Sequence, residues 1–396
     1  MLAGNHFLTH SLRSFPKGEA VSRILQAALA GADPEILLKK TIKIKGDKLE
    51  IGGQNHSFSD FDRIFLLAVG KAAVPMARAA ASLLYPRIQA GLVVTNQTDP
   101  EKVQDLDLEL IPAGHPVPNQ KSLTAGKKVL NFTSRLKARD LLLVLLSGGG
   151  SALLAAPHPG LSIEDFQTAQ QALLHSGANI AEINIVRKHL SEIKGGRLAA
   201  SAHPASVISL ILSDVHPHPL EMVASGPTYP DPSTFRDAAN VIDKYQLESS
   251  LPGAVLNHIQ RGIRGEIPET HKPGDLIFNR VTNLEIGSNQ NAVQAALSQA
   301  DQEDFSAIKA DFILEGEART AGLELAGVLQ DLSLIKNRDQ KPYCLAAGGE
   351  TTVTLDPNSS GLGGRNLELA LGAVKIMDNL RNSALVTLAT DGIDGS

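Results

Sequence analysis

The stretch LLLVLLSGGGSALL, residues 141–154, decides the fold, because an apolar run passes through three consecutive glycines into a second apolar segment. An uninterrupted apolar run such as 141–146 is typical of a strand buried on both faces of a parallel sheet. Glycine lets the backbone approach a neighbour or a ligand closely, and free N–H groups at a helix start favour an anion. We interpret the loop as a phosphate-binding loop, the alternative being a tight turn packed on a neighbouring strand. Its residues are Ser147, Gly148, Gly149, Gly150 and Ser151.

The same pattern recurs along the chain, because several short apolar runs end in a small or polar cluster and then enter a helical pattern. These runs are 64–69, 206–212, 283–287, 343–348 and 384–389. Apolar strands that alternate with helices predict an α/β fold, with parallel sheets covered on both faces. At 396 residues the chain exceeds the usual size of one core. We predict two domains, 1–260 and 275–396, with the boundary in the less patterned region 249–279.

The composition is that of an ordinary globular protein, with 43% apolar and 20% charged residues. A net charge of −5 and a pI near 6.2 argue against nucleic acid or an anionic membrane surface as the main partner. The most apolar window, 141–156, is too short and too glycine-rich for a membrane span. Cys344 is the single cysteine, which excludes an internal disulfide and fits a reducing compartment. We therefore expect a cytoplasmic protein without a membrane span.

Polar residues follow the predicted strands, where parallel sheets bind their ligands. They are Lys71, Ser147, Asp214, Asn289, Glu350 and Asp391. We interpret them as parts of one shared site. For the Ser, Asp and Asn residues the alternative is helix capping, because these types are preferred at N-caps.

Two cations stand at predicted helix starts, Lys71 after Gly70 and Arg365 in the segment GLGGRN. A cation opposes the helix dipole there, so a bound phosphate or carboxylate explains its position. Arginine can hold such a group with both arms of its guanidinium. The alternatives are a solvated surface lysine and an arginine used in packing.

The segment 178–196 has apolar residues at helical spacing and predicts an amphipathic helix that ends at Gly195. Its other faces carry Asn184, Arg187, Lys188, Ser191 and Lys194. Basic residues near a helix C-terminus often only balance the dipole. As a group, these residues could supply positive potential to a cleft.

Carboxylates thus accompany glycine loops and basic side chains, the mixture that phosphoryl transfer with Mg²⁺ requires. The chain has neither GxxxxGK[ST] nor a complete GxGxxG, since GLGGRN lacks the last glycine. His216 and His218 are flanked by prolines and lack a third ligand, so we interpret them as loop residues rather than a metal pair. The proline-rich segment 216–232 predicts a long ordered loop of functional importance.

Ten segments together resemble the two-domain glycerate 2-kinases, a family also described as hydroxypyruvate reductases, whose C-terminal part is the MOFRL domain. They are AVGKAAVPMA (68–77), GHPVPN (114–119), LLLVLLSGGGSALL (141–154), INIVRKHLSEIKGGRLA (183–199), LILSDV (210–215), ASGPT (224–228), GEART (316–320), LAAGGETTVTL (345–355), GGRNLELAL (363–371) and TDGIDG (390–395). The resemblance spans nearly the whole chain.

The resemblance implies a Rossmann-like domain over 1–260, a smaller MOFRL-like α/β domain over 275–396 and an active site in the cleft between them. It implies phosphorylation of D-glycerate at the 2-hydroxyl by ATP, giving 2-phosphoglycerate and ADP, with Mg²⁺ or another divalent cation. Matching residues to the family's motifs, we expect Lys71, Arg365 and Asp214 to be catalytic, with Asp214 also the candidate metal ligand. We expect ATP to contact Ser147, Gly148, Gly149, Gly150, Ser151, Asn289 and Glu350. We expect D-glycerate to be bound by Lys71, Arg365, Lys194 and Asp391.

The chain departs from the family at its end, stopping at Ser396 where the family continues. We therefore expect the second domain to lack one element of its sheet and part of the cleft wall. Two other functions stay open at this point, a hydroxypyruvate reductase and a non-catalytic protein that binds glycerate or nucleotide. The sequence does not decide the metal, the pathway or whether the chain forms homo-oligomers.

Overall fold

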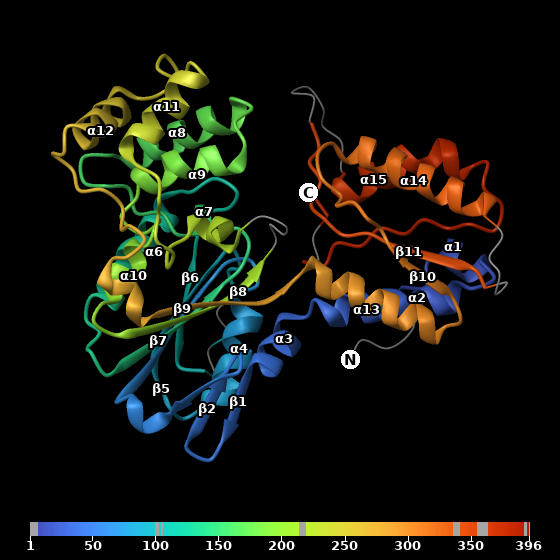
Figure 1. Cartoon of the computed structure of the whole chain (residues 1–396), viewed down its shortest axis with the longest axis horizontal. Helices are drawn as coiled ribbons and strands as arrows, with labels where there is room; N and C mark the ends of the chain where they lie inside the picture. Colours follow the sequence, from blue (N-terminus) through green and yellow to red (C-terminus); the bar gives the residue numbers. More distant parts are fainter. Residues whose placement is uncertain are drawn as a thin grey trace. The chain divides into compact units, whose positions relative to one another are not determined.

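The computed structural model describes residues 7–99, 103, 106–213, 219–335, 341–354, 363–391 and 394–395. The chain forms two compact units. Residues 38–286 form what we call the sheet unit, and residues 1–37 with 287–396 form the terminal unit. Both units combine helices and strands, which confirms the predicted two-domain α/β organisation (Figure 1).

The sheet unit is built on a six-stranded sheet in the order β6-β5-β4-β7-β8-β9. The pairs β6–β5, β5–β4, β4–β7 and β7–β8 are parallel. The strands are β4 Arg63–Val69, β5 Ile88–Thr95, β6 Leu108–Pro112, β7 Asp140–Leu146, β8 Ser206–Ser213 and β9 Val281–Ser288. The apolar runs 64–69, 141–146, 206–212 and 283–287 thus form strands, as predicted.

The central strands are buried on both faces, which is why they are apolar throughout. Phe65, Leu67 and Val69 face one side with alternate residues of β7, and they pack with residues from α6 Gln120–Thr133 and α10 Arg197–Ala202. Helix α4, Ala73–Leu84, contacts β4, β5 and β7 but adds no residue to that cluster. It therefore covers the other face of the sheet.

Strands β4 and β7 are held in register by an ion pair between their first residues. At the amino ends, Arg63 donates from Nε and Nη2 to the two oxygens of Asp140, at 2.9 and 2.6 Å. Burial opposes ionisation of Asp140, yet the hydrogen bonds and charge of Arg63 keep the pKa of this carboxyl below its usual value. The register runs unbroken to Val69 and Leu146, so the two following turns meet.

A group of helices gathers at one end of the six-stranded sheet, drawn in green to yellow in Figure 1. Its members are α8 Ile163–His175, α9 Ile180–His189, α11 Phe235–Lys244 and α12 Gly253–Ile263, with the four-residue helix α7 Gly150–Leu153 below them. They share a core that includes Phe166, Val186, Phe235 and Ile259. An antiparallel sheet of β1 Ile42–Lys45, β2 Lys48–Ile51 and β3 Gln54–Ser57 completes the sheet unit. The short helices η1 Phe58–Asp60, η2 Leu220–Ser225 and η3 Leu276–Arg280 lie in its connections.

The terminal unit joins the two ends of the described chain. Ala20 and Ile24 of α2 Gly18–Gly31 pack against Ala296 and Ala300 of α13 Asn289–Gln302. Its strands β10 Ser306–Lys309 and β11 Tyr343–Ala346 pair in parallel, and α14 Ala318–Leu334 lies beside α15 Arg365–Met377 (Figure 1). The remaining helices are α1 His10–Ser14 and α3 Pro34–Thr41, which runs across the boundary between units.

The structure differs from the sequence-based expectations in four places. Residues 1–37 belong to the terminal unit rather than to the first domain, because α2 packs on α13. Helix α12 lies inside the region 249–279 that we expected to be unpatterned. The run 384–389 is not a strand.

The fourth difference is the end of α9, which is His189 rather than Gly195. Residues 190–192 instead pair with the segment after α7, since Glu192 N donates to Ala156 O and His158 N donates to Leu190 O, at 2.8 and 2.9 Å. Within the described residues, none of the helices is long and apolar enough to cross a membrane.

We predict that Gly70→Ala lowers the free energy of unfolding by about 3 kcal/mol. Gly70 has φ +133°, and a Cβ there would lie 2.1 Å from Ser147 Oγ and 2.6 Å from Ser147 O. Gly46→Ala is the matched control, since Gly46 has φ +62° and nothing within 4 Å of its Cβ position, and it should cost only about 1 kcal/mol. Urea unfolding measures both; equal losses would contradict the prediction.

Candidate functional site

The turn after β4 lies directly against the glycine loop after β7, so the structure brings two of the predicted site segments together. Ser147 N donates to Val69 O at 3.0 Å, Lys71 N to Gly148 O at 2.9 Å and Ala72 N to Ser147 Oγ at 3.1 Å. The printed contacts of Lys71 with the loop are made by its backbone N–H. The adjacency follows from the parallel register of β4 and β7.

Gly149 lies where three segments meet. It has φ +83°, and a Cβ built on it would lie 3.0 Å from His115 Nε2 and 3.4 Å from Lys71 Cγ. The stem of the Lys71 side chain therefore runs past the glycine loop, and the His115 ring lies beside it. Sequence reasoning did not nominate His115, although it follows β6 as the other candidates follow their strands.

The glycine loop presents backbone donors. Within the described residues, the N–H groups of Gly149, Gly150 and Ser151 have no hydrogen-bond acceptor. Consecutive N–H groups of this kind form a concave site for an anion. The loop is therefore suited to a phosphate, and the Lys71 side chain next to it adds positive charge.

A second set of side chains reaches the loop from α9 and from the segment that follows it. Lys194 Nζ donates to Ser151 O at 2.8 Å. The hydroxyls of Ser151 and Ser225 are 2.9 Å apart, and Ser225 donates to Asn184 Oδ1 at 2.9 Å. The predicted ligand Lys194 thus lies next to the loop, but it is buried behind it, with 1% of its surface exposed.

Two buried cations influence each other here. Burial lowers the pKa of Lys194 to about 7, and the positive charge of Arg187 contributes to the shift. Burial also lowers the pKa of Arg187 to about 10. The site therefore holds more positive charge than its buried surroundings stabilise.

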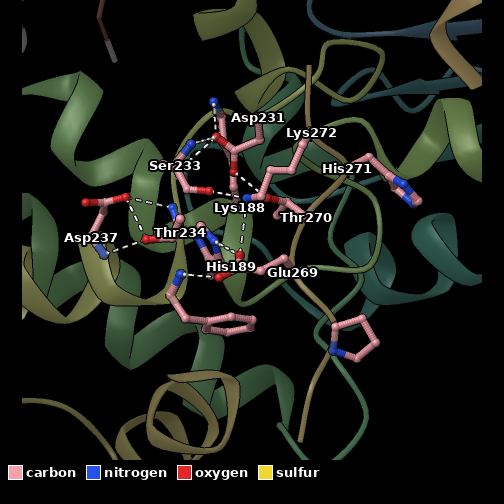
Figure 2. Close-up of polar contacts among 12 residues, drawn as sticks. Lys188, His189, Asp231, Ser233, Thr234, Asp237, Glu269, Thr270, His271 and Lys272 are labelled. Atoms are coloured by element: carbon pink, nitrogen blue, oxygen red, sulfur yellow. Dashed lines mark hydrogen bonds and ion pairs between the residues drawn. The ribbon is translucent and has the colours of Figure 1, made fainter. Parts of the chain in front are cut away.

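Figure 2 shows the polar network that holds the C-terminal turn of α9 in place. Lys188 Nζ lies 3.4 Å from Asp231 Oδ1, and Asp231 also accepts hydrogen bonds from Ser233 and Thr270. Burial opposes ionisation of Asp231, but the charge of Lys188 and the hydroxyl of Ser233 keep the pKa of this carboxyl below its usual value. His189 Nε2 lies 3.1 Å from Glu269 Oε2 in the same network.

This network is a structural one, because its charged groups satisfy one another. It joins α9 to the start of α11, where Phe235 N donates to Glu269 Oε1, and to the loop at Lys272 (Figure 2). It therefore anchors the last turn of α9, in which Arg187 precedes Lys188.

In the terminal unit, the structure brings Arg365, Glu350 and Asn289 into one region. Arg365 Nη1 forms a hydrogen-bonded ion pair with Glu350 Oε1. Asn289, the first residue of α13, lies beside Gly348, and its Oδ1 is buried without a hydrogen-bond partner in the described structure. These are the predicted site residues of this unit, apart from Asp391, which is exposed.

The N-terminus of α15 already has an anionic partner that sequence reasoning missed. Asp394 accepts hydrogen bonds from Asn366 N at 2.8 Å and Leu367 N at 3.1 Å. Burial opposes ionisation of Asp394, but these donors keep the pKa of its carboxyl low. Arg365 is thus the group of this helix start that can receive a further anion.

The predicted metal ligand Asp214 and the histidines His216 and His218 lie outside the described residues. Among the residues that the structure describes, no cluster of three or more His, Cys, Asp or Glu side chains could hold a metal ion. Glu350, a carboxylate at a strand end, is paired with Arg365.

We predict that the free energy of unfolding of the wild-type protein increases with pH, and that Lys194→Met makes this increase smaller. The unfolded chain keeps the Lys194 proton up to pH 10.5, whereas the folded protein releases it at about 7. The cost of the buried charge is therefore complete below about pH 7 and decreases as the pH rises towards the unfolded value. From about pH 6 to about pH 9, the free energy of unfolding of wild type should rise by about 3 kcal/mol relative to that of Lys194→Met, as measured by urea unfolding.

The control for this measurement is Lys128→Met, which removes an exposed lysine paired with Glu109. Lys128→Met should keep the pH slope of wild type. A Lys194→Met curve parallel to wild type over the same pH range would show that Lys194 is not forced into a costly charged state.

Comparison with known proteins extends over both units. Residues 20–260 match a family model described as a domain of unknown function (DUF4147), and residues 343–396 match the MOFRL family. A Pyrococcus horikoshii protein named glycerate 2-kinase is 38% identical over 373 residues, which cover 94% of this chain and 82% of that protein. A D-glycerate 2-kinase of Thermotoga maritima is 39% identical, with 92% of this chain and 85% of that protein covered. The crystal structure of Thermotoga maritima glycerate kinase has a TM-score of 0.73 at 36% identity, covering 92% and 80% of the two chains.

Proposed function

The chain belongs to the glycerate 2-kinase family, and we propose that it transfers the terminal phosphoryl group of ATP to the 2-hydroxyl of D-glycerate. The products are 2-phospho-D-glycerate and ADP. The observation that carries this proposal is the contact of the Lys71 turn with the glycine loop, whose N–H groups are open to an anion. We include a divalent cation in the proposal, with Asp214 as its candidate ligand.

In the proposed reaction, the 2-oxygen of glycerate forms a bond to the terminal phosphorus of ATP. The bond from that phosphorus to the bridging oxygen of ADP breaks, and the hydroxyl proton is released. Charge builds up on the phosphoryl oxygens during the transfer, so fixed donors and cations lower the barrier. The N–H groups of Gly149, Gly150 and Ser151 and the Lys71 side chain would serve as these donors.

We assign the substrate carboxylate to Arg365. A guanidinium binds a carboxylate through two parallel hydrogen bonds, and Arg365 already holds one carboxylate, that of Glu350. Glycerate would replace Glu350 as its partner. Roles for Asn289 and Asp391 in binding the substrates are part of this proposal.

The test is to incubate the protein with ATP, Mg²⁺ and D-glycerate and identify the product by NMR. We expect phosphate on the 2-oxygen with wild type. With Lys71→Ala we expect a rate at least ~100-fold lower, since a charge-stabilising donor is lost. The control Lys121→Ala removes a lysine at the start of α6 and should keep the wild-type rate.

Other outcomes of this assay would contradict the proposed activity and indicate a different one. Phosphate on the 3-oxygen would change the regiochemistry, and oxidation of NADH with hydroxypyruvate would indicate the reductase. Binding of ATP and D-glycerate without turnover would indicate a binding protein. A folded Lys71→Ala protein with the wild-type rate would remove Lys71 from the mechanism.

We predict that Gly149→Val abolishes ATP binding and leaves D-glycerate binding intact, as measured by isothermal titration calorimetry. A side chain at φ +83° would be strained and would displace His115 and the Lys71 stem from the loop. Gly160→Val is the matched control, because Gly160 has φ +93° but open space around its Cβ position. Loss of glycerate binding alone would assign the loop to the other substrate.

We also propose a cytoplasmic location, supported by the single cysteine Cys344.

A further inference from the structure

Arg187 is a buried cation whose charge the described structure leaves unbalanced. It lies on α9 with 7% of its surface exposed, and its Nε is buried without a hydrogen-bond partner. Among the described residues, no carboxylate forms an ion pair with it. A buried charge without a partner costs free energy, and buried charges in proteins are normally paired.

Arg197 provides a direct comparison within the same unit. Its Nε is also buried without a partner, and burial lowers the pKa of its guanidinium. However, Glu192, Glu269 and Asp231 lie close enough to counteract that shift. Arg197 is therefore balanced by carboxylates of the protein itself. For Arg187, no carboxylate of the described chain counteracts the effect of burial on its pKa, and its positive charge acts on Lys194, another cation.

The surroundings of Arg187 place it next to the glycine loop. Asn184 lies one turn earlier on the same face of α9, and it accepts a hydrogen bond from Ser225, whose hydroxyl contacts that of Ser151. Lys194, whose pKa Arg187 influences, donates to Ser151 O. Two cations and two hydroxyls therefore gather behind the end of the loop.

We propose that Arg187 binds an oxyanion group of a substrate, phosphoryl or carboxylate, at the end of the loop 147–151. The proposal rests on the proposed function, because it adds a ligand to the same site. It explains why Arg187 Nε has no hydrogen-bond partner in the described structure and why two cations are buried side by side, since a bound anion would supply the missing negative charge. The network around Lys188 and Asp231 keeps the helix that carries Arg187 in place.

The test compares Arg187→Gln with Arg197→Gln by calorimetric titration with ATP, with D-glycerate and with inorganic phosphate, each alone. We expect Arg187→Gln to weaken at least one probe by roughly tenfold or more, and Arg197→Gln to bind all three like wild type. Arg187→Lys, which keeps the charge but loses the planar fork, should bind with intermediate affinity. Loss confined to ATP and phosphate would indicate a phosphoryl group, and loss confined to D-glycerate a carboxylate.

Thermal unfolding without ligand separates this role from a structural one. Arg187→Gln removes an unbalanced charge and should unfold at the same or a higher temperature than wild type, whereas Arg197→Gln should unfold at a lower one. A strongly destabilised Arg187→Gln protein would assign the arginine to folding and overturn the proposal. Wild-type affinity of Arg187→Gln for all three probes, or failure of wild type to bind any of them, would overturn it as well.

The NMR assay on the same wild-type protein distinguishes failure of this inference from failure of the proposed function. If wild type makes phosphoglycerate and Arg187→Gln binds all probes normally, only the inference fails. If wild type makes none but binds phosphate through Arg187, the oxyanion site stands and the kinase assignment fails.

Discussion

The backbone contact between the turn after β4 and the loop after β7 is the constraint on which the candidate site depends. Arg63 and Asp140 pair at the amino ends of these strands, and the unbroken register carries Gly70 onto Ser147 at the other ends. A slip of one residue would exchange the two faces of each strand. The same slip would separate Lys71 from the loop, so the pairing that builds the core also assembles the site.

Buried charge is distributed unevenly in the sheet unit. Lys188 pairs with Asp231, and Arg197 has carboxylates nearby. Among the described residues, no carboxylate forms an ion pair with Arg187 or Lys194, and the charge of Arg187 acts on Lys194. A fold gains nothing from two adjacent buried cations, since each raises the cost of the other. Their position behind the glycine loop is explained if a bound anion belongs to the functional state.

Much of the sheet could be predicted because its central strands are buried on both faces, as 64–69 and 141–146 show. A search for uninterrupted apolar runs does not find β6, because β6 is an edge strand with partly exposed residues. His115, which follows β6, was missed for the same reason. The run 384–389 is apolar but is not a strand in the structure, because strands also need a pairing partner. The Arg365–Glu350 pair and the end of α9 depend on contacts between distant residues, which local patterns do not encode.

The two units offer an anion different kinds of partner. At the glycine loop, backbone N–H groups of residues 149–151 have no acceptor among the described residues. At α15, Asp394 already occupies the corresponding N–H groups, so a further anion there must bind the guanidinium of Arg365. Backbone donors at a concave loop suit the several oxygens of a phosphate chain, whereas a guanidinium fork matches the two oxygens of a carboxylate. This difference supports the proposed assignment of nucleotide phosphate to the loop of the sheet unit and of the glycerate carboxylate to Arg365.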